Sequence, residues 1–334
     1  MTHSNITVKD LARICGVSIG TVDRAINNRK GISEETRQRI LKTAAEYGFV
    51  KNQSALSLSS GRSKTIGVII FNLKSEYFAS VLTSIEEEAR HSGHTTMIML
   101  SHYDAETEME CVRRMVSMNV AGIIVFSVLK NTDFYTELQK NGTPVVAVGN
   151  PIGAGIPFVG IDDRLAMRES CRYVLSKGYR HLVYIAPVLE KRMEQNIAAQ
   201  ANRYAGFLEV VQNAVDVTWH VVDTYEEYQN NLTGVLSKDR STALICSSDT
   251  FTLRCLEVFR NTEHAGIMGF DRFPTLEQLL PKLSGIAYSS KDIGIAAAHV
   301  ILDATHSDVL LPFEVISITR MAKTNQLLLN GKIE

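Results

Sequence analysis

The sequence has no long hydrophobic run, and this absence excludes a membrane-spanning helix. No stretch of about 18 apolar residues occurs, although 45% of the 334 residues are hydrophobic and the mean hydropathy is near zero. The first residues, Met1 to Asn5, are polar, so we expect no signal peptide. We therefore expect a globular, cytoplasmic protein that makes no contact with a membrane.

Cysteine is scarce and poorly spaced for metal or disulfide chemistry. The five cysteines form no CxxC pair, their number is odd, and most have apolar neighbours in the sequence. They are Cys15, Cys111, Cys171, Cys246 and Cys255. We expect buried free thiols in a reducing compartment, and no metal site.

The common signatures of nucleotide binding and catalysis are also missing. There is no GxxxxGK[ST] phosphate loop, no GxSxG elbow and no HExxH pair. The segment Gly149–Gly155 is rich in glycine, but no helix is predicted after it, which favours a crossover loop. Asp162, Asp163, Asp249 and Asp271 each follow a predicted strand, where polar groups also gather simply to bind a ligand. We expect no catalytic residues and no cofactor.

Net charge is nearly absent overall, but it is unevenly distributed. The whole chain carries −1, whereas residues 1–64 hold 11 Lys and Arg against 5 Asp and Glu, a net of +6. The remaining residues carry −7. A basic head on an acidic body is the distribution that binding to DNA phosphates requires.

Residues 7–50 have the pattern of three short helices. Thr7 and Ser18 are predicted N-caps, Gly16 lies between them at the end of the first helix, and Ser33 opens the third. The residues expected on the inner faces are Val8, Leu11, Ala12, Cys15, Val22, Ile26, Ile40, Leu41, Ala44 and Tyr47. Two helices joined by a tight turn, with a third as support, form a helix-turn-helix, whose second helix enters the DNA major groove. The alternative is an unrelated three-helix bundle, which the basic charge of this segment disfavours.

After a Ser-rich link with a weak helical patch, strands and helices alternate. Strands are expected at 66–71, 95–100, 121–126 and 144–148, then at 181–186, 219–223, 243–246 and 266–270, with a late helix at 291–305 and a strand at 314–319. This alternation predicts βαβ units and doubly wound parallel sheets in two tandem halves. A cleft between such halves, at the carboxyl ends of the strands, suits a small ligand.

Several motifs, taken together and in order, resemble the lactose/galactose-repressor (LacI/GalR) family. Thr7 to Arg24, with Asn27 and Ser33, is similar to the DNA-binding head of that family, and Asn52-x-x-Ala55-x-x-Leu58 to its hinge helix. The matching body motifs are Gly67-Val68-Ile69, Gly122-Ile123-Ile124, Pro144-Val145-Val146, Arg203-Tyr204-Ala205-Gly206-Phe207 and Gly269-Phe270-Asp271. The resemblance covers nearly the whole chain.

The resemblance implies an α/β fold class with a small all-α helix-turn-helix domain in front. Two doubly wound, Rossmann-like parallel-sheet subdomains of periplasmic-binding-protein type I follow it. The expected parts are a head at 1–50, a hinge at 51–64, a first subdomain at 65–163 with 291–320, and a second at 164–290 with 321–334. The implied function is a ligand-responsive repressor of a carbohydrate-use operon. It would bind a palindromic operator in double-stranded DNA as a homodimer and respond to a sugar-like effector.

The resemblance also assigns DNA contacts residue by residue. Ile19, Gly20 and Arg24 fall at base-reading positions, and Arg24 is suited to a bidentate contact with guanine. The positions for phosphate contacts are Thr7, Ser18, Thr21, Asn27 and Ser33, and the hinge positions are Asn52, Ala55 and Leu58, of which Leu58 is the minor-groove wedge. Asp23 stands where that family has Ser, and we expect its carboxylate to turn to Arg24 or Lys30.

The resemblance implies an effector site in the body. Its residues are Tyr77, Phe78, Asp162, Arg203, Tyr225, Ser248, Asp249 and Asp271. For Phe78, sugar stacking and core packing are both open, and Tyr225 could instead cap the following helix. A guanidinium is almost never buried unpaired, which favours a polar role for Arg203.

Two other classes of protein remain as alternatives. One is a sugar-processing α/β enzyme with an accessory DNA-binding head, which turnover of candidate sugars by the purified protein would reveal. The other is a transport binding protein, which the basic head and the polar first residues disfavour.

Overall fold

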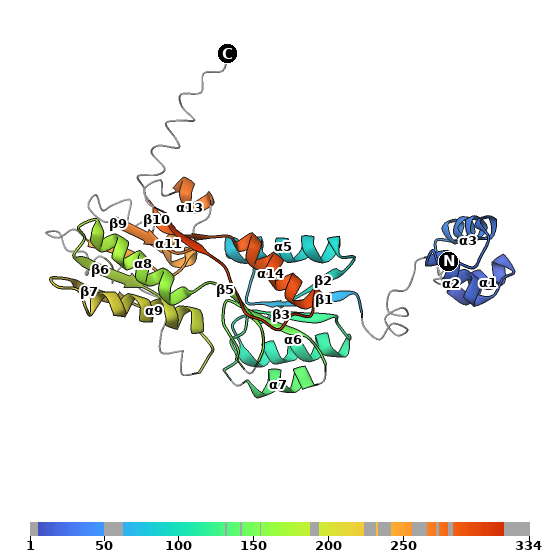
Figure 1. The fold of residues 1–334 in the computed structure, drawn as a ribbon, viewed down its shortest axis with the longest axis horizontal. Helices are drawn as coiled ribbons and strands as arrows, with labels where there is room; N and C mark the ends of the chain where they lie inside the picture. Colours follow the sequence, from blue (N-terminus) through green and yellow to red (C-terminus); the bar gives the residue numbers. More distant parts are fainter. Residues whose placement is uncertain are drawn as a thin grey trace, which may run out of the picture. The chain divides into compact units, whose positions relative to one another are not determined.

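A computed structural model describes most of the chain. The described residues are 6–49, 63–130, 132–140, 142–153, 155–187, 194–223, 232, 242–255, 266–271, 274–279 and 283–316. The chain divides into two compact units, a head unit (Met1–Ser63) and a body unit (Lys64–Glu334) (Figure 1). Among the described residues, no helix is both long enough and apolar enough to cross a bilayer.

The head unit contains the expected three helices. They are α1 (Val8–Cys15), α2 (Ile19–Ile26) and α3 (Glu34–Glu46). Each begins at a residue whose side chain accepts a hydrogen bond from the backbone of its own first turn: Thr7, Ser18 and Ser33. Gly16 ends α1 with φ +64°, a left-handed conformation that glycine adopts without steric cost.

The core of the head is small, and the sequence predicted it only in part. Its buried side chains are Leu11, Ala12, Val22, Ala25, Ile40 and Ala44. The expected burial of Leu41 and Tyr47 is wrong, because 38% and 58% of these residues are exposed. Leu41 follows Ile40 by one residue, a rotation of about 100° that turns it off the inner face, and Tyr47 lies at the end of α3.

The first half of the body is built on a parallel sheet of order β11-β5-β4-β3-β1-β2. Its strands are β1 (Thr65–Ile70), β2 (Thr95–Leu100), β3 (Gly122–Val125), β4 (Val145–Val148), β5 (Phe158–Gly160) and β11 (Val309–Leu310). Its helices are α5 (Glu76–His91), α6 (Ala105–Ser117), α7 (Asp133–Lys140) and α14 (Ser290–Leu302). Val68 packs with residues of α5 and α14, and its neighbour Ile69 packs with residues of α6 and α7. These two pairs of helices lie on opposite sides of the sheet (Figure 1), so both of its faces are buried.

The second half repeats this plan with a sheet of order β12-β10-β9-β8-β6-β7. Its strands are β6 (His181–Ile185), β7 (Thr218–Val222), β8 (Thr242–Cys246), β9 (Gly266–Gly269), β10 (Ser284–Tyr288) and β12 (Phe313–Ile316). Its helices are α8 (Asp163–Ser176), α9 (Ala198–Val211), α11 (Asp249–Arg254) and α13 (Pro274–Leu279). The strands run parallel except β12, which pairs antiparallel with β10.

The last described strand corrects one expected boundary. We assigned residues 291–320 to the first subdomain, but β12 within that range pairs with β10 of the second half. In the described part of that range, only α14 and β11 join the first half, and the chain returns to the second half after Leu310. The pattern of a short apolar strand carries no information about which sheet the strand will join.

Each half contains a helix pair in close contact at a glycine. A Cβ on Gly206 of α9 would lie 2.2 Å from the carbonyl oxygen of Arg164 on α8, and one on Gly294 of α14 would lie 2.5 Å from that of Val81 on α5. Only glycine permits such an approach of two backbones.

The single tryptophan of the chain contacts helix α9. The ring of Trp219, on β7, meets the ring of Phe207 edge-on, with centroids 5.9 Å apart.

Candidate functional site

The predicted base-reading residues lie on the outer side of α2. Ile19, Gly20 and Arg24 are exposed, whereas Val22 and Ala25 of the same helix are buried in the head core. The backbone carbonyl oxygen of Arg24 accepts a hydrogen bond from Arg29 N at 2.9 Å, but within the described residues no hydrogen bond or ion pair engages its guanidinium. A helix that presents such a face to the solvent can enter the major groove without disturbing its own core.

Most of the predicted phosphate contacts lie at helix starts, whereas Asn27 is the C-cap of α2. Thr7, Ser18 and Ser33 are exposed N-caps, and the hydroxyl of Thr21 lies 2.9 Å from that of Ser18. Helix N-termini attract phosphate through their unpaired N–H groups and the helix dipole. The hinge positions Asn52, Ala55 and Leu58 lie outside the described residues. All these DNA contacts stay predictions.

The sequence predicts that the carboxylate of Asp23 contacts Arg24 or Lys30, and this prediction is wrong. Its carboxylate accepts hydrogen bonds from Asn27 Nδ2 at 2.7 Å and from Arg29 Nη1 at 2.9 Å. Residues four apart face each other on a helix, whereas Arg24 is adjacent in sequence and points elsewhere. Asp23 therefore fixes the side chain of Asn27, a predicted phosphate contact.

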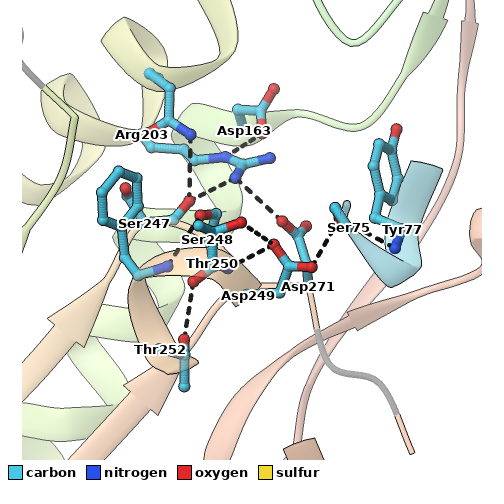
Figure 2. A network of polar contacts seen from close by, with 12 residues as sticks. Ser75, Tyr77, Asp163, Arg203, Ser247, Ser248, Asp249, Thr250, Thr252 and Asp271 are labelled. Atoms are coloured by element: carbon cyan, nitrogen blue, oxygen red, sulfur yellow. Dashed lines mark hydrogen bonds and ion pairs between the residues drawn. The ribbon is translucent and has the colours of Figure 1, made fainter. Parts of the chain in front are cut away.

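In the body, polar residues follow the carboxyl ends of several second-half strands. Ser247 and Asp249 come after β8, Asp271 after β9, and Tyr288 ends β10. Figure 2 shows many of these residues around the guanidinium of Arg203, which comes from α9, with Ser75 and Tyr77 contributed by the start of α5. The group therefore lies at the junction of the two halves, where ligands of doubly wound folds bind.

Arg203 is buried, with 7% of its surface exposed, and is held by groups of the protein. Its Nε donates to Asp163 Oδ1 at 2.8 Å, its Nη1 donates to the carbonyl oxygen of Ser247 at 2.6 Å, and Nη1 lies 3.6 Å from Asp271 Oδ2. The guanidinium also stacks over the ring of Phe270, 3.6 Å from its centroid. These contacts make Arg203 the cation that keeps buried carboxylates in place.

Asp271 is a strained and desolvated carboxylate. Its φ of +60° is unusual for a residue with a side chain, and its oxygen Oδ1 accepts a short hydrogen bond from the hydroxyl of Tyr288. Burial raises the pKa of Asp271 from its usual 3.8 to about 6, although Arg203 and Tyr288 act to lower it. Asp271 thus combines an ordered position with acceptor capacity.

Asp249 links the two halves directly. It is buried at the start of α11, where Ser248 is the N-cap, and its Oδ2 accepts a hydrogen bond from Ser75 Oγ of the first half at 2.8 Å. Tyr77 follows two residues later, and its ring lies 6.1 Å from that of Tyr288. Burial, followed by the charge of Asp271, raises the pKa of Tyr77 above its usual value of 10.

The structure does not gather all the predicted effector residues. Phe78 meets Phe71 and Phe126 edge-on in the first-half core, which favours the packing role for it. Asp162 is exposed and caps α8 through Leu165 N, whereas its neighbour Asp163 binds Arg203. Tyr225 lies outside the described residues.

Sequence reasoning missed four members of this group: Ser75, Asp163, Ser247 and Tyr288. Asp163 was visible as the second half of an Asp-Asp pair after a strand, but the pair alone does not say which carboxylate turns inward.

The described residues contain no cluster of His, Cys, Asp and Glu that could hold a metal ion, and the five cysteines are free.

The raised pKa of Asp271 predicts how stability changes with pH. Between about pH 4 and 6 the unfolded chain loses this proton while the folded chain keeps it, so stability falls as pH rises. Asp271→Asn removes this dependence. We expect its free energy of unfolding, relative to wild type, to increase by about 2 kcal/mol from pH 4 to pH 7 in urea titrations.

Asp104 supplies the control for this measurement. Hydrogen bonds from the side chain and backbone of Thr107 lower its pKa, so Asp104→Asn should give a difference from wild type of the opposite sign. A gap between Asp271→Asn and wild type that stays constant with pH would contradict the assignment.

Family models match both parts of the chain. Residues 63–311 match the periplasmic binding proteins and sugar binding domain of the LacI family, and residues 7–52 match the bacterial regulatory proteins of the lacI family. The two matches together span most of the sequence and meet near the division between head and body units.

Individual relatives are similar over nearly their full length. The chain is 25% identical to the HTH-type transcriptional regulator IdnR of Escherichia coli (strain K12), over 94% of this chain and 98% of that protein. It is 26% identical to catabolite control protein A of Priestia megaterium, over 89% and 92%. The first of these relatives is named as a transcriptional regulator.

Solved structures agree on the fold. A LacI-family transcriptional regulator from Silicibacter pomeroyi has a TM-score of 0.74 at 26% identity and covers 93% of this chain and 98% of its own. A lac repressor dimer bound to operator and the anti-inducer ONPF has a TM-score of 0.81 at 18% identity, over 95% and 99%. The second likeness concerns the fold alone.

Proposed function

Because the chain belongs to the LacI family of bacterial regulatory proteins, and so is a DNA-binding transcriptional regulator, we propose that it represses a carbohydrate-use operon in response to a small neutral sugar. The effector binds at the junction of the two halves, among Tyr77, Arg203, Asp249 and Asp271. Repression acts on bacterial DNA, which assigns the protein to the cytoplasm.

The chemistry of the buried carboxylates carries the choice of effector. Arg203 already donates to Asp163 and Ser247 and pairs with Asp271, so its charge is largely used to hold these groups of the protein and not to bind an anionic ligand. Asp249 and Asp271 have acceptor capacity beyond the contacts that hold them. Ionised carboxylates only accept hydrogen bonds, which suits the hydroxyl donors of a sugar and repels phosphates and sugar acids.

Relatives support the same reading by name. Ribose operon repressors from Halalkalibacterium halodurans and Haemophilus influenzae are 24% and 22% identical to this chain, and a similar fold is described as the complex of the regulator CelR with cellobiose. The lac repressor structure contains a dimer on its operator. We propose that this chain likewise binds a palindromic site as a homodimer.

A thermal-shift screen of the full chain tests the effector. Neutral sugars and polyols should be paired with their acid and phosphate forms, and the true effector at 100 times its Kd should add about 2.7 kcal/mol to the stability of the body unit. Asp249→Asn should abolish that shift. Stabilisation by the anionic partners alone would overturn the proposed class of ligand.

The head carries a separate prediction. Arg24→Ala should cost about 1–3 kcal/mol of DNA affinity and relax the preference at one position of each half-site, because a bidentate contact with guanine is lost. Selection of binding sites from a random DNA library, with wild type and variant in parallel, measures both effects. Arg13→Ala, which removes an exposed arginine of α1, should leave the selected sequence unchanged, and the assignment fails if Arg24→Ala does so too.

A further inference from the structure

Helix α9, which carries Arg203, begins without a cap from its own side chains. Its N-cap residue is Ile197, which makes no side-chain hydrogen bond to the helix. Eight other described helices begin at side chains that accept a hydrogen bond from their own first turn: Thr7, Ser18, Ser33, Ser75, Asp104, Asp162, Ser248 and Ser289. The first N–H groups of α9 therefore need partners from outside the helix.

One of these partners comes from the other half of the body. Asn150, which follows β4 in the first half, accepts a hydrogen bond from Ala199 N through its Oδ1 at 3.0 Å. Asn196 Oδ1 accepts a hydrogen bond from Ala198 N at 3.2 Å. Arg203 lies one helical turn beyond Ala199, so the segment that Asn150 caps leads directly into the site.

The orientation of the Asn150 amide is set by three partners at once. Its Nδ2 donates to the carbonyl oxygens of Ser127 at 3.1 Å and Asn196 at 3.0 Å, which leaves Oδ1 for the N–H of Ala199. If the amide were reversed, Oδ1 would face the carbonyl oxygens of Ser127 and Asn196, and Nδ2 would face the N–H of Ala199, so none of the three hydrogen bonds could form. Asn150 is also buried, so water does not readily take over its role.

A buried carboxylate fixes residues 127 and 128, which follow β3 and which Asn150 and Asn196 contact. Glu108 of α6 has no exposed surface, and it accepts hydrogen bonds from Ser127 Oγ at 2.5 Å and from Val128 N at 2.7 Å. The hydroxyl of Tyr135 also donates to it. The carbonyl oxygens of Ser127 and Val128 are thereby fixed, and they receive Asn150 Nδ2 and Asn196 N respectively.

The segment before α9 is attached to the first half at further points. Asn196 N donates to the carbonyl oxygen of Val128 at 2.8 Å, and Asn196 Nδ2 donates to that of Pro151 at 3.0 Å. Gln195 Nε2 donates to the carbonyl oxygen of Tyr103 at 2.9 Å. The body of α9, by contrast, packs in the second-half core through Phe207 and Val211.

We propose that Asn150 is a helix cap supplied across the junction, so that the first turns of α9 are ordered by contact with the opposite half. Separation of the halves at this point uncaps α9 and loosens the turn before Arg203. A ligand that draws the halves together would restore the cap, and this consequence rests on the proposed function. Asn150 is thus a positioning residue that acts through α9.

Hydrogen exchange of the full chain, without any ligand, tests the cap. Asn150→Ala should lower the protection of residues 198–203 about 5-fold, the factor that corresponds to a lost N-cap of ~1 kcal/mol. Asn150→Ser, whose shorter side chain cannot make all three contacts at once, should give a similar loss. Asp104→Ala, which removes the cap of α6 within the first half, should affect 105–110 and leave α9 unchanged.

Two results would overturn the proposal. One is unchanged protection of α9 in Asn150→Ala, or a loss confined to the first half, since Asn150 would then serve only its own loop. The other is an equal loss of α9 protection in the Asp104→Ala control, because the effect would then be a general loosening of the body and not a lost cap. If the alanine variant does not fold, unchanged protection of α9 in Asn150→Ser contradicts the cap by itself. None of these outcomes depends on the identity of the effector.

Discussion

Arg203→Ala should lower the free energy of unfolding of the body unit by about 3–5 kcal/mol at neutral pH. The guanidinium lies within 2.8 Å of Asp163 and 3.6 Å of Asp271, and all three side chains are buried. Without it, two carboxylates remain inside the protein without their cation, and this costs more than the ion pair itself contributes. Urea unfolding followed by circular dichroism measures the loss.

Arg164 provides a matched control one helix away. It forms an ion pair with Glu209, but 55% of its side chain is exposed, so Arg164→Ala should cost about 1 kcal/mol or less. The loss in Arg203→Ala should shrink at low pH, because burial raises the pKa values of Asp163 and Asp271 and protonation removes the stranded charge. Equal losses in the two variants would show that the network contributes nothing beyond a surface ion pair.

Leu11→Ala should abolish DNA binding by unfolding the head. Leu11 is fully buried against Val22 and Ile40, and truncation of such a leucine costs about 2–5 kcal/mol. A three-helix unit of this size has little stability in reserve. Binding to fluorescent DNA at low salt should be lost, while the thermal transition of the body unit, which forms a separate compact unit, should not move.

Leu41→Ala is the natural comparison, because the sequence suggested that both leucines are buried. Leu41 is 38% exposed on α3, and its truncation should change stability by no more than about 0.5 kcal/mol. A large effect at Leu41 with a small one at Leu11 would mean that the head packs differently from the arrangement described.

Local chemistry accounts for what the sequence predicted well. Thr7, Ser18 and Ser33 cap the helices that follow them because the capping bond spans only a few residues. Apolar strands separated by helices give parallel sheets because both faces of each strand must be covered. The order of the helices and strands could therefore be predicted from the sequence without knowledge of any contact between them.

Contacts between segments that are far apart in the sequence could not be predicted from local patterns. Asp162 and Asp163 are chemically identical in the sequence, and only the rotation of α8 turns one to the solvent and the other to Arg203. β12 pairs with β10 of the second sheet, and Asn150 meets Ala199 across 49 residues of chain, so no local pattern in the sequence indicates either contact. The effector residues were assigned through a resemblance, and the group around Arg203 contains several that the resemblance did not supply.

The packing of Trp219 against Phe207 gives the protein a spectroscopic label of its own. The chain has a single tryptophan, which is 39% exposed on the edge strand β7 and in edge-on contact with α9. Its emission therefore arises from the second half alone, and the DNA-binding head contributes no tryptophan signal. Emission wavelength, quenching by acrylamide and anisotropy would follow the movement of α9 in the wild-type protein, on or off DNA, without any dye or substitution.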